Sequence, residues 1–345
     1  MRLRLNKKVL KTIIGLLAVL TLLLAGALLL RAWEEGRPPA DSYKQTDMSL
    51  QTDPDGQELV YYEGAWYTPR KNLEVVLFLG LDRSTQDESI PTHGSYAQSD
   101  AVLLLAADRD SKTYKVIHIN RDTMVEIQDF DKSGNPSGTY TAQLALAYAH
   151  AQAFTGNDRT AARAAMDAVS GLLYGLEIDH YVTLTMDGLV VLNDLVGGVE
   201  VEIRDDFSAI DSTLAQGETV TLLGQHALNY VRTRWWVGDS TNLERMERQT
   251  QYLEALQKKL SDLAEQDEGF VLSALMAAND YMTSDCTAQQ LVELSDIVRS
   301  CETDGILNLE GKALMGEQYV EFHPDEESLQ KLVVDCFYEQ AGKIE

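Results

Sequence analysis

The sequence predicts an α/β protein: a three-layer α/β/α sandwich around a central mixed sheet, preceded by one transmembrane helix. Short apolar runs rich in β-branched residues alternate with alanine-rich stretches at helical spacing, which is typical of layered folds. An uncharged apolar segment lies near the N-terminus. The chain has 345 residues, 45% of them hydrophobic, which is enough to bury a sizeable core.

Residues 12–30 carry no charge and are mostly Leu, Ile, Val and Ala, and a spanning helix needs roughly 20 such residues. Basic residues crowd the chain before this segment, whereas only Arg31 follows it closely. The positive-inside rule therefore predicts a cytoplasmic tail over residues 1–11, a transmembrane helix over 12–30 and a single-pass protein of the cell membrane with its C-terminal part extracellular. The alternative is a cleaved signal peptide, whose apolar core normally has ~7–15 residues, and Ala25–Ala27 leaves cleavage open.

The net charge of −25 is unevenly distributed, because every charged residue before Glu34 is basic. A body this acidic repels nucleic acid, which excludes nucleic acid as a partner. An anionic ligand can bind only where arginines cluster locally.

The three cysteines, Cys286, Cys301 and Cys336, lack Cys-x-x-Cys spacing, which disfavours a zinc site. Two alternatives remain for them. Either Cys286 and Cys301 form one disulfide in an oxidising space, or all three are buried small apolar residues.

A polar stretch with several prolines, residues 31–71, predicts an extracellular stalk with a short hairpin around Tyr61–Tyr67. Residues 72–345 form the folded domain. Its expected strands cover residues 75–79, 101–107, 115–119, 181–185, 199–203, 306–309 and 319–322. Its expected helices cover residues 143–154, 159–174, 187–195 (capped by Asp187), 224–231, 243–263, 288–301 and 326–338.

Two aspartates flank the first two buried strands of this domain. Asp82 follows the first strand after a glycine, and Asp100 opens the second. Ligands of open α/β sheets bind outside strand ends, and two carboxylates there can hold a hard cation such as Mg²⁺. The alternative is that each aspartate caps a turn.

Arginines cluster in the middle of the chain. Arg121 follows the third strand, where it is either solvated in a turn or directed at an anion. Residues 230–249 contain four more arginines, and Arg245 shares a helix face with Gln249. They either pair with acidic neighbours such as Glu244 or grip a phosphate, whose oxygens match the planar guanidinium fork. We favour the phosphate.

Seven short motifs occur in one order behind the N-terminal segment: Leu79–Asp82, Ser99–Leu104, Arg121–Thr123, Asp179–Val182, Gly197–Val199, Tyr230–Arg234 and Arg245–Gln249. This order resembles the LytR-CpsA-Psr family of bacterial cell-wall enzymes, from about Asn72 to the C-terminus. The resemblance implies an α/β/α sandwich. It also implies a Mg²⁺-dependent phosphotransferase that moves a teichoic acid or capsular polysaccharide from a polyprenyl pyrophosphate carrier to peptidoglycan.

The resemblance also implies roles for individual residues. Asp82 and Asp100 would hold Mg²⁺, and the apolar interior would take the lipid tail. The catalytic residues would be Asp82, Arg121, Arg232 and Arg234. The pyrophosphate would be bound by Arg121, Arg232, Arg234, Arg245, Arg248 and Gln249. Three alternatives remain for the group that takes the proton of the attacking hydroxyl: Asp82, metal-bound hydroxide or no dedicated base.

The chain departs from the family pattern at several positions. Gln98 stands where the family has Arg, Asn120 where it has Pro, and Gln143 where it has Lys. Asn242 stands where the family has Asp, and Asp239 is a candidate substitute. Because two basic residues are missing, two other functions remain: a non-catalytic or regulatory paralogue that binds polyprenyl pyrophosphate lipids, and a lipid pyrophosphate hydrolase.

Overall fold

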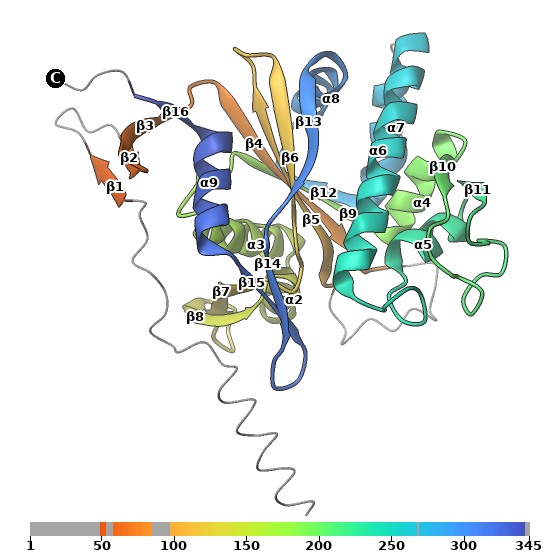
Figure 1. Cartoon of the computed structure of the whole chain (residues 1–345), viewed down its shortest axis with the longest axis horizontal. Helices are drawn as coiled ribbons and strands as arrows, with labels where there is room; N and C mark the ends of the chain where they lie inside the picture. Colours follow the sequence, from red (N-terminus) through yellow and green to blue (C-terminus); the bar gives the residue numbers. More distant parts are fainter. Residues whose placement is uncertain (1–48, 53–57, 85–96, 268, 342–345) are drawn as a thin grey trace, which may run out of the picture. The chain divides into compact units, whose positions relative to one another are not determined.

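A six-stranded sheet in the order β12-β9-β4-β5-β6-β13 forms the centre of the computed structural model (Figure 1). Strands β4, β5 and β6 pair antiparallel, whereas β9 joins β4 and β13 joins β6 in parallel, so the predicted mixed sheet is confirmed. The structure describes residues 49–52, 58–84, 97–267 and 269–341. The six strands are β4 (Leu73–Leu81), β5 (Ser99–Asp108), β6 (Thr113–Ile119), β9 (His180–Thr185), β12 (Met282–Ser284) and β13 (Glu302–Asn308).

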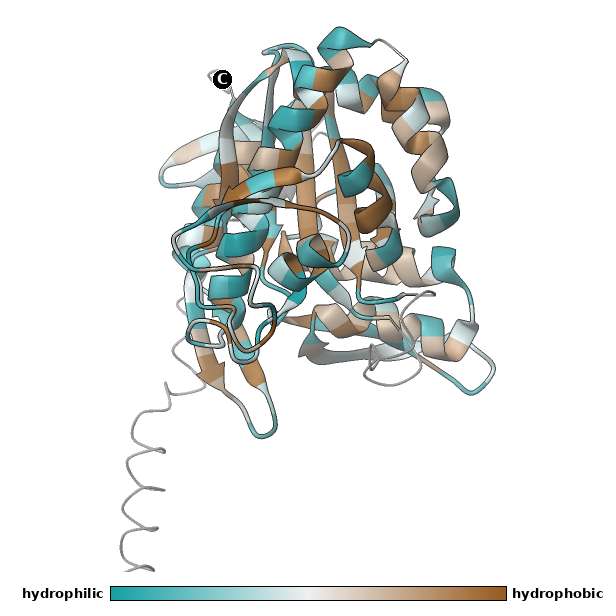
Figure 2. Ribbon diagram, turned by 90° about the vertical axis from the view of Figure 1, so that its right-hand side faces the viewer, coloured by the Kyte–Doolittle hydropathy of each residue, from teal (hydrophilic) through white to brown (hydrophobic). Residues whose placement is uncertain are grey.

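Side chains of β4 alternate between the two faces of the sheet, as the period of a strand requires. Leu77 and Leu79 join a core built with α2, α3 and α9, while Val76 packs on the opposite face with Leu294 and Ile297 of α8. Burying one such side chain contributes about 1.5–3 kcal/mol. Helices thus cover both faces of the hydrophobic strands (Figure 2). Their bounds are α2 (Ala145–Thr155), α3 (Asp158–Leu172), α8 (Ala288–Ser300) and α9 (Glu326–Phe337).

Helix α6 (Asn242–Gln266) also packs on the second face, where Gln257 donates a hydrogen bond to the hydroxyl of Tyr114 on β6. On its other side, α6 borders a smaller core that includes Phe207 and Tyr230. Around this core lie α4 (Met186–Leu195), β10 (Val199–Glu202), β11 (Thr219–Leu222), α5 (Gln225–Arg232) and α7 (Phe270–Ala278), which η1 (Asn279–Tyr281) follows. The cap of α4 differs from the prediction: Thr185, not Asp187, accepts a hydrogen bond from the backbone N–H of Gly188.

The expected stalk ends earlier than residue 71. Strands β1 (Ser49–Thr52), β2 (Glu58–Tyr62) and β3 (Ala65–Pro69) form a sheet with the C-terminal strand β16 (Tyr338–Gln340). The expected hairpin is present as β2 and β3. Val60 and Tyr62 are buried in the main core, which fixes this sheet to the domain. The folded domain therefore begins before Asn72.

Two hairpins lie near one end of the central sheet, and of their four strands only the last was predicted, as residues 319–322. They are β7 (Met124–Phe130) with β8 (Pro136–Gln143), and β14 (Gly311–Met315) with β15 (Val320–Pro324). In each hairpin one strand is largely exposed. Its residues therefore do not alternate between apolar and polar, and this alternation is the pattern by which a strand is predicted. None of the described helices is long and apolar enough to cross a membrane, and the transmembrane prediction at 12–30 lies outside the described residues.

The described residues include all three cysteines, and no disulfide joins them. Cys336 is buried in the main core, while Cys286 and Cys301 are partly buried against the apolar cluster under α8. The structure therefore supports the second alternative, in which the cysteines act as small apolar side chains.

Candidate functional site

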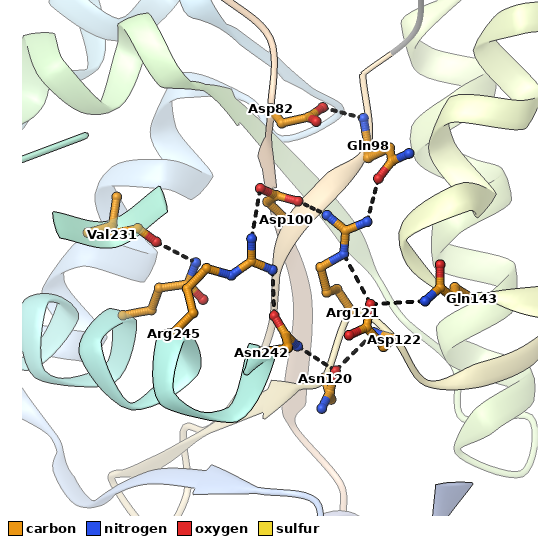
Figure 3. A network of polar contacts seen from close by, with 11 residues as sticks. Asp82, Gln98, Asp100, Asn120, Arg121, Asp122, Gln143, Val231, Asn242 and Arg245 are labelled. Atoms are coloured by element: carbon orange, nitrogen blue, oxygen red, sulfur yellow. Dashed lines mark hydrogen bonds and ion pairs between the residues drawn. The ribbon is translucent and has the colours of Figure 1, made fainter. Parts of the chain in front are cut away.

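Two aspartates lie at neighbouring strand ends, where β4 ends and β5 begins. Leu81 pairs with Ser99 across the two strands, so Asp82 and Asp100 extend from neighbouring positions at one end of the sheet. The backbone N–H of Gln98 donates to Asp82 Oδ1 at 2.5 Å, which holds that side chain in place. Figure 3 shows Asp82 beside Gln98, and Asp100 between Arg121 and Arg245.

Asp100 is held between two guanidinium groups. Arg121, which follows β6, donates to Asp100 Oδ1 and also to the side-chain oxygen of Gln98. From the other side, Arg245 of α6 donates to Asp100 Oδ2 at 3.2 Å (Figure 3). One carboxylate therefore links an arginine of the sheet to an arginine of the covering helix.

The first turn of α6 sets the position of Arg245. Thr241 caps the helix by accepting from the backbone N–H of Glu244. Asn242 accepts from Arg245 Nη2 at 2.5 Å and donates its own amide to Asn120 Oδ1 at 2.7 Å. Because Asn120 lies at the end of β6, this chain of contacts fixes the helix start against the sheet. Asn242 itself holds Arg245, whereas Asp239, the candidate substitute, accepts from the backbone N–H of Thr241.

The two guanidinium groups lie in a nearly dry environment. Burial, with the nearby charge of Arg245, lowers the pKa of Arg121 to about 10, and burial lowers the pKa of Arg245 to about 10. Both remain protonated at neutral pH. Their Nε atoms and Oε1 of Gln249 are buried without a hydrogen-bond partner among the described residues. Such unsatisfied groups are rare in native interiors and mark a place where a ligand or water completes the network.

The remaining predicted arginines occupy different places. Arg234 is half buried, and its pKa is lowered by burial and by Arg245, with Asp122 opposing, so it lies within reach of both. Arg232 is the last residue of α5 and is partly buried. Gln249 donates to the carbonyl of Val231 at 3.1 Å, which ties α6 to this segment.

The structure does not bring Arg248 to the site. Its guanidinium donates to Asp205 at 2.6 Å and to the carbonyls of Tyr230 and Thr233, and it lies 5.5 Å from the ring of Phe207. All of these partners belong to the small core or the segment that closes it. Arg248 therefore joins α5 to α6 instead of lining a pyrophosphate pocket.

Sequence reasoning missed a set of buried polar residues beneath the arginines. Asp122 is 2% exposed, accepts from Gln143 at 3.1 Å and lies 3.5 Å from Arg121 Nε. Gln143 also donates to the carbonyl of Val320 on the β14–β15 hairpin. The Asn120–Thr123 stretch was visible as a motif, but its burial depends on this distant hairpin.

His118 carries the site's clearest pH dependence. Burial and the charge of Arg245 lower its pKa to about 4, against an ordinary value near ~6.5. The unfolded chain therefore binds the proton more readily, so stability is complete above pH ~6.5 and falls by about 3 kcal/mol as pH drops toward 4. Urea midpoints at pH 7 and pH 4.5 should differ less in His118→Gln than in the wild type. Equal differences in the two proteins would contradict the assignment.

The family model of the LytR_cpsA_psr family matches residues 41–335 of this chain. The chain belongs to this family. Among curated relatives, it is 31% identical to the teichoic acid transferase TagV of Bacillus subtilis over 54% of this chain and 43% of that protein. It is 26% identical to TagU of Enterococcus faecalis over 86% of this chain and 84% of that protein. The match to TagV spans less than half of that relative's length.

Solved structures support the same LytR_cpsA_psr fold. The crystal structure of B. subtilis TagT has a TM-score of 0.54 at 21% identity, covering 77% of this chain and 90% of that chain. A structure titled as TagT bound to LI-WTA has the same TM-score at 22% identity and the same coverage. These likenesses concern the fold.

Two departures from the LytR_cpsA_psr pattern now have structural partners. Gln98 accepts from Arg121, and Gln143 donates to Asp122, so both amides are integrated in the network. Both amides take part in the network as neutral side chains.

Proposed function

We propose that this protein transfers a phosphorylated glycopolymer from a polyprenyl pyrophosphate carrier to peptidoglycan during bacterial cell-wall assembly. The observation that carries the proposal is the pair Arg121 and Arg245, two buried guanidinium groups that converge on Asp100 at the end of the sheet. Such a pair suits a pyrophosphate, whose oxygens accept from two guanidinium forks. The family and the names of TagU and TagV, which are teichoic acid transferases, support the same conclusion.

Phosphoryl transfer requires positioning and neutralisation of charge more than covalent chemistry by the protein. A peptidoglycan hydroxyl attacks the phosphorus next to the sugar, the bond to the bridging oxygen breaks, and polyprenyl phosphate leaves. Arg121, Arg245 and Arg234 bind the pyrophosphate oxygens and stabilise the charge that develops on them. Asp100 orients the first two arginines. Asp82 is our candidate for the base that accepts the proton of the hydroxyl.

We include Mg²⁺ in the proposal. Asp82 and Asp100 offer hard oxygen donors at adjacent strand ends, and Mg²⁺ is usually bound through one or two carboxylates together with substrate phosphates. The ion would supply further neutralisation of the pyrophosphate. Among the described residues, the group of three side chains that could hold a metal ion, with ligand atoms within 4.8 Å of one another, is elsewhere, at His180, Asp285 and Cys286.

The proposed location is the cell membrane, with residues 1–11 in the cytoplasm, residues 12–30 spanning the bilayer and the folded domain outside. This arrangement rests on the sequence alone, through the uncharged segment and its basic flank. It places the domain beside both the lipid carrier and the wall.

The test uses the full-length protein with Mg²⁺, a polyprenyl pyrophosphate oligosaccharide and nascent peptidoglycan, following labelled sugar into the polymer. Arg121→Ala should reduce transfer by about 10²-fold or more, because a buried donor to the pyrophosphate is lost. A chelator should also stop transfer. Arg109→Ala is the matched control, since Arg109 is exposed and pairs with Glu74 at the other end of β5.

Two other outcomes would decide against transfer. Tight binding of the lipid without transfer would favour a binding paralogue, which the neutral Gln98 and Gln143 would then explain. Release of lipid phosphate without a sugar acceptor would identify a pyrophosphate hydrolase. Transfer by Arg121→Ala at the wild-type rate would refute the proposed site.

A further inference from the structure

Five large apolar side chains are exposed on two segments beside the site. Trp235 and Trp236, between α5 and α6, are 59% and 76% exposed. Leu314, Met315 and Tyr319, at the turn of the β14–β15 hairpin, are 45%, 70% and 50% exposed. We call these five residues the apolar rim. Both segments lie at the lower end of the domain in Figure 1.

The two parts of the rim flank the polar site. In the first part, the guanidinium of Arg234 stacks 4.5 Å above the ring of Trp235. The charge of Arg245 lowers the pKa of Arg234, and the charge of Asp122 raises it. In the second part, the hairpin is joined to Asp122, whose carbonyl accepts from the backbone N–H of Phe322 at 2.8 Å. Asp122 is thus bonded to the hairpin through its backbone, and its charge acts on Arg234 of the tryptophan segment.

One residue of the apolar rim, Trp236, has an unfavourable backbone conformation. Trp236 has a φ of +61°, in the left-handed region that bulky residues rarely adopt. Its ring is nevertheless largely exposed to solvent instead of packed in a core. Conformations of this kind persist where the surrounding structure imposes them, and they cluster at ligand clamps and functional segments.

We propose that the apolar rim docks on the outer surface of a lipid bilayer, so that the arginine pocket faces the headgroup layer. Trp and Tyr prefer the membrane interface, where one end of the side chain is apolar and the other wet. Leu314 and Met315 at the hairpin turn suit insertion among acyl chains. The proposal rests on the proposed function only in placing the lipid-linked substrate in that bilayer.

Charge and chain length favour a membrane over other occupants. The chain is too acidic to adsorb on anionic lipid by charge, so apolar insertion must supply the attraction. In the membrane arrangement proposed above, residues 31–48 are the tether between the apolar segment 12–30 and β1, and 18 residues span at most about 60 Å when fully extended. Sugar polymers also stack on tryptophan. A sugar-binding surface, however, has no need of exposed aliphatic side chains such as Leu314 and Met315.

The test reads the emission of the rim tryptophans in the full-length protein, reconstituted in phosphatidylcholine vesicles without substrate. Trp33→Phe and Trp66→Phe leave Trp235 and Trp236 as the reporters. Docking predicts a blue-shifted emission that brominated phosphatidylcholine quenches. Emission typical of exposed tryptophan, unquenched by brominated lipid, would overturn the proposal. So would a spectral change that requires added peptidoglycan fragments.

A matched pair of variants locates the contact. Leu314→Ser with Met315→Ser should cause a loss of the quenching, whereas Met276→Ser on α7, at a residue 72% exposed, should not. The double variant should also lose transfer from a carrier embedded in vesicles while retaining transfer from a short-chain, water-soluble carrier. An equal loss with both carriers would place the hairpin in the pocket itself and overturn docking. If the wild type transfers nothing, the proposed function fails, but the quenching result stands on its own.

Discussion

Arg245→Ala is expected to reduce transfer to peptidoglycan by about 10³-fold, the largest effect of any single change on activity. Arg245 is 5% exposed and supplies a buried positive charge to the proposed pyrophosphate site. Its loss also removes one of the two guanidinium groups that orient Asp100. The fold should persist, because Asp100 keeps its ion pair with Arg121. Initial rates at saturating acceptor, together with melting curves, separate the two effects.

Arg245→Lys sharpens this expectation. A lysine retains the charge but offers a single ammonium in place of the planar fork. Because Arg245 reaches Asp100 and Asn242 with different nitrogens, the lysine should recover only part of the lost rate. Full recovery would mean that charge alone suffices, and an unchanged rate in Arg245→Ala would remove this arginine from the mechanism.

Arg248→Ala should produce the largest loss of stability, about 3 kcal/mol in the free energy of unfolding. The side chain is 3% exposed and satisfies Asp205 together with two backbone carbonyls of the segment after α5. Removing it leaves these acceptors without a donor. The urea midpoint at constant slope measures the change.

Arg248→Ala should bind the lipid carrier almost normally at a temperature where it is folded, in contrast to Arg245→Ala. This comparison tests the assignment of the two arginines, which lie only three residues apart. A variant that is stable but has lost lipid binding would return Arg248 to the pyrophosphate pocket.

The strands of the site were predictable because their signal is local. The apolar run ending before Asp82 and the one opening with Asp100 specify two buried strands, and the ends of neighbouring strands meet by necessity. The two arginines of α6 were not distinguishable in this way. Both side chains are buried. Because α6 lies between the sheet and the small core, Arg245 pairs with Asp100 of the sheet, whereas Arg248 pairs with Asp205 beside the small core.

Long-range pairing explains the other differences. Residues 58–69 look like part of a polar stalk because their partner strand, β16, lies at the opposite end of the domain sequence. Asn120, Gln143 and Asn242 are neutral polar residues whose burial no local pattern reveals. Their roles follow from a helix start and a hairpin that come together only in the folded chain.

The carboxylate between the two guanidinium groups has a consequence for selectivity. Asp100 already accepts from one nitrogen of each guanidinium, so an entering anion competes for these groups with a tethered acceptor whose effective concentration is in about the millimolar range or above. An ion that offers one charge and one contact at lower concentration does not win this competition. A pyrophosphate, which can engage both forks at once, does. In the proposed function, the site thus selects ligands that engage both guanidinium groups over ions that engage only one.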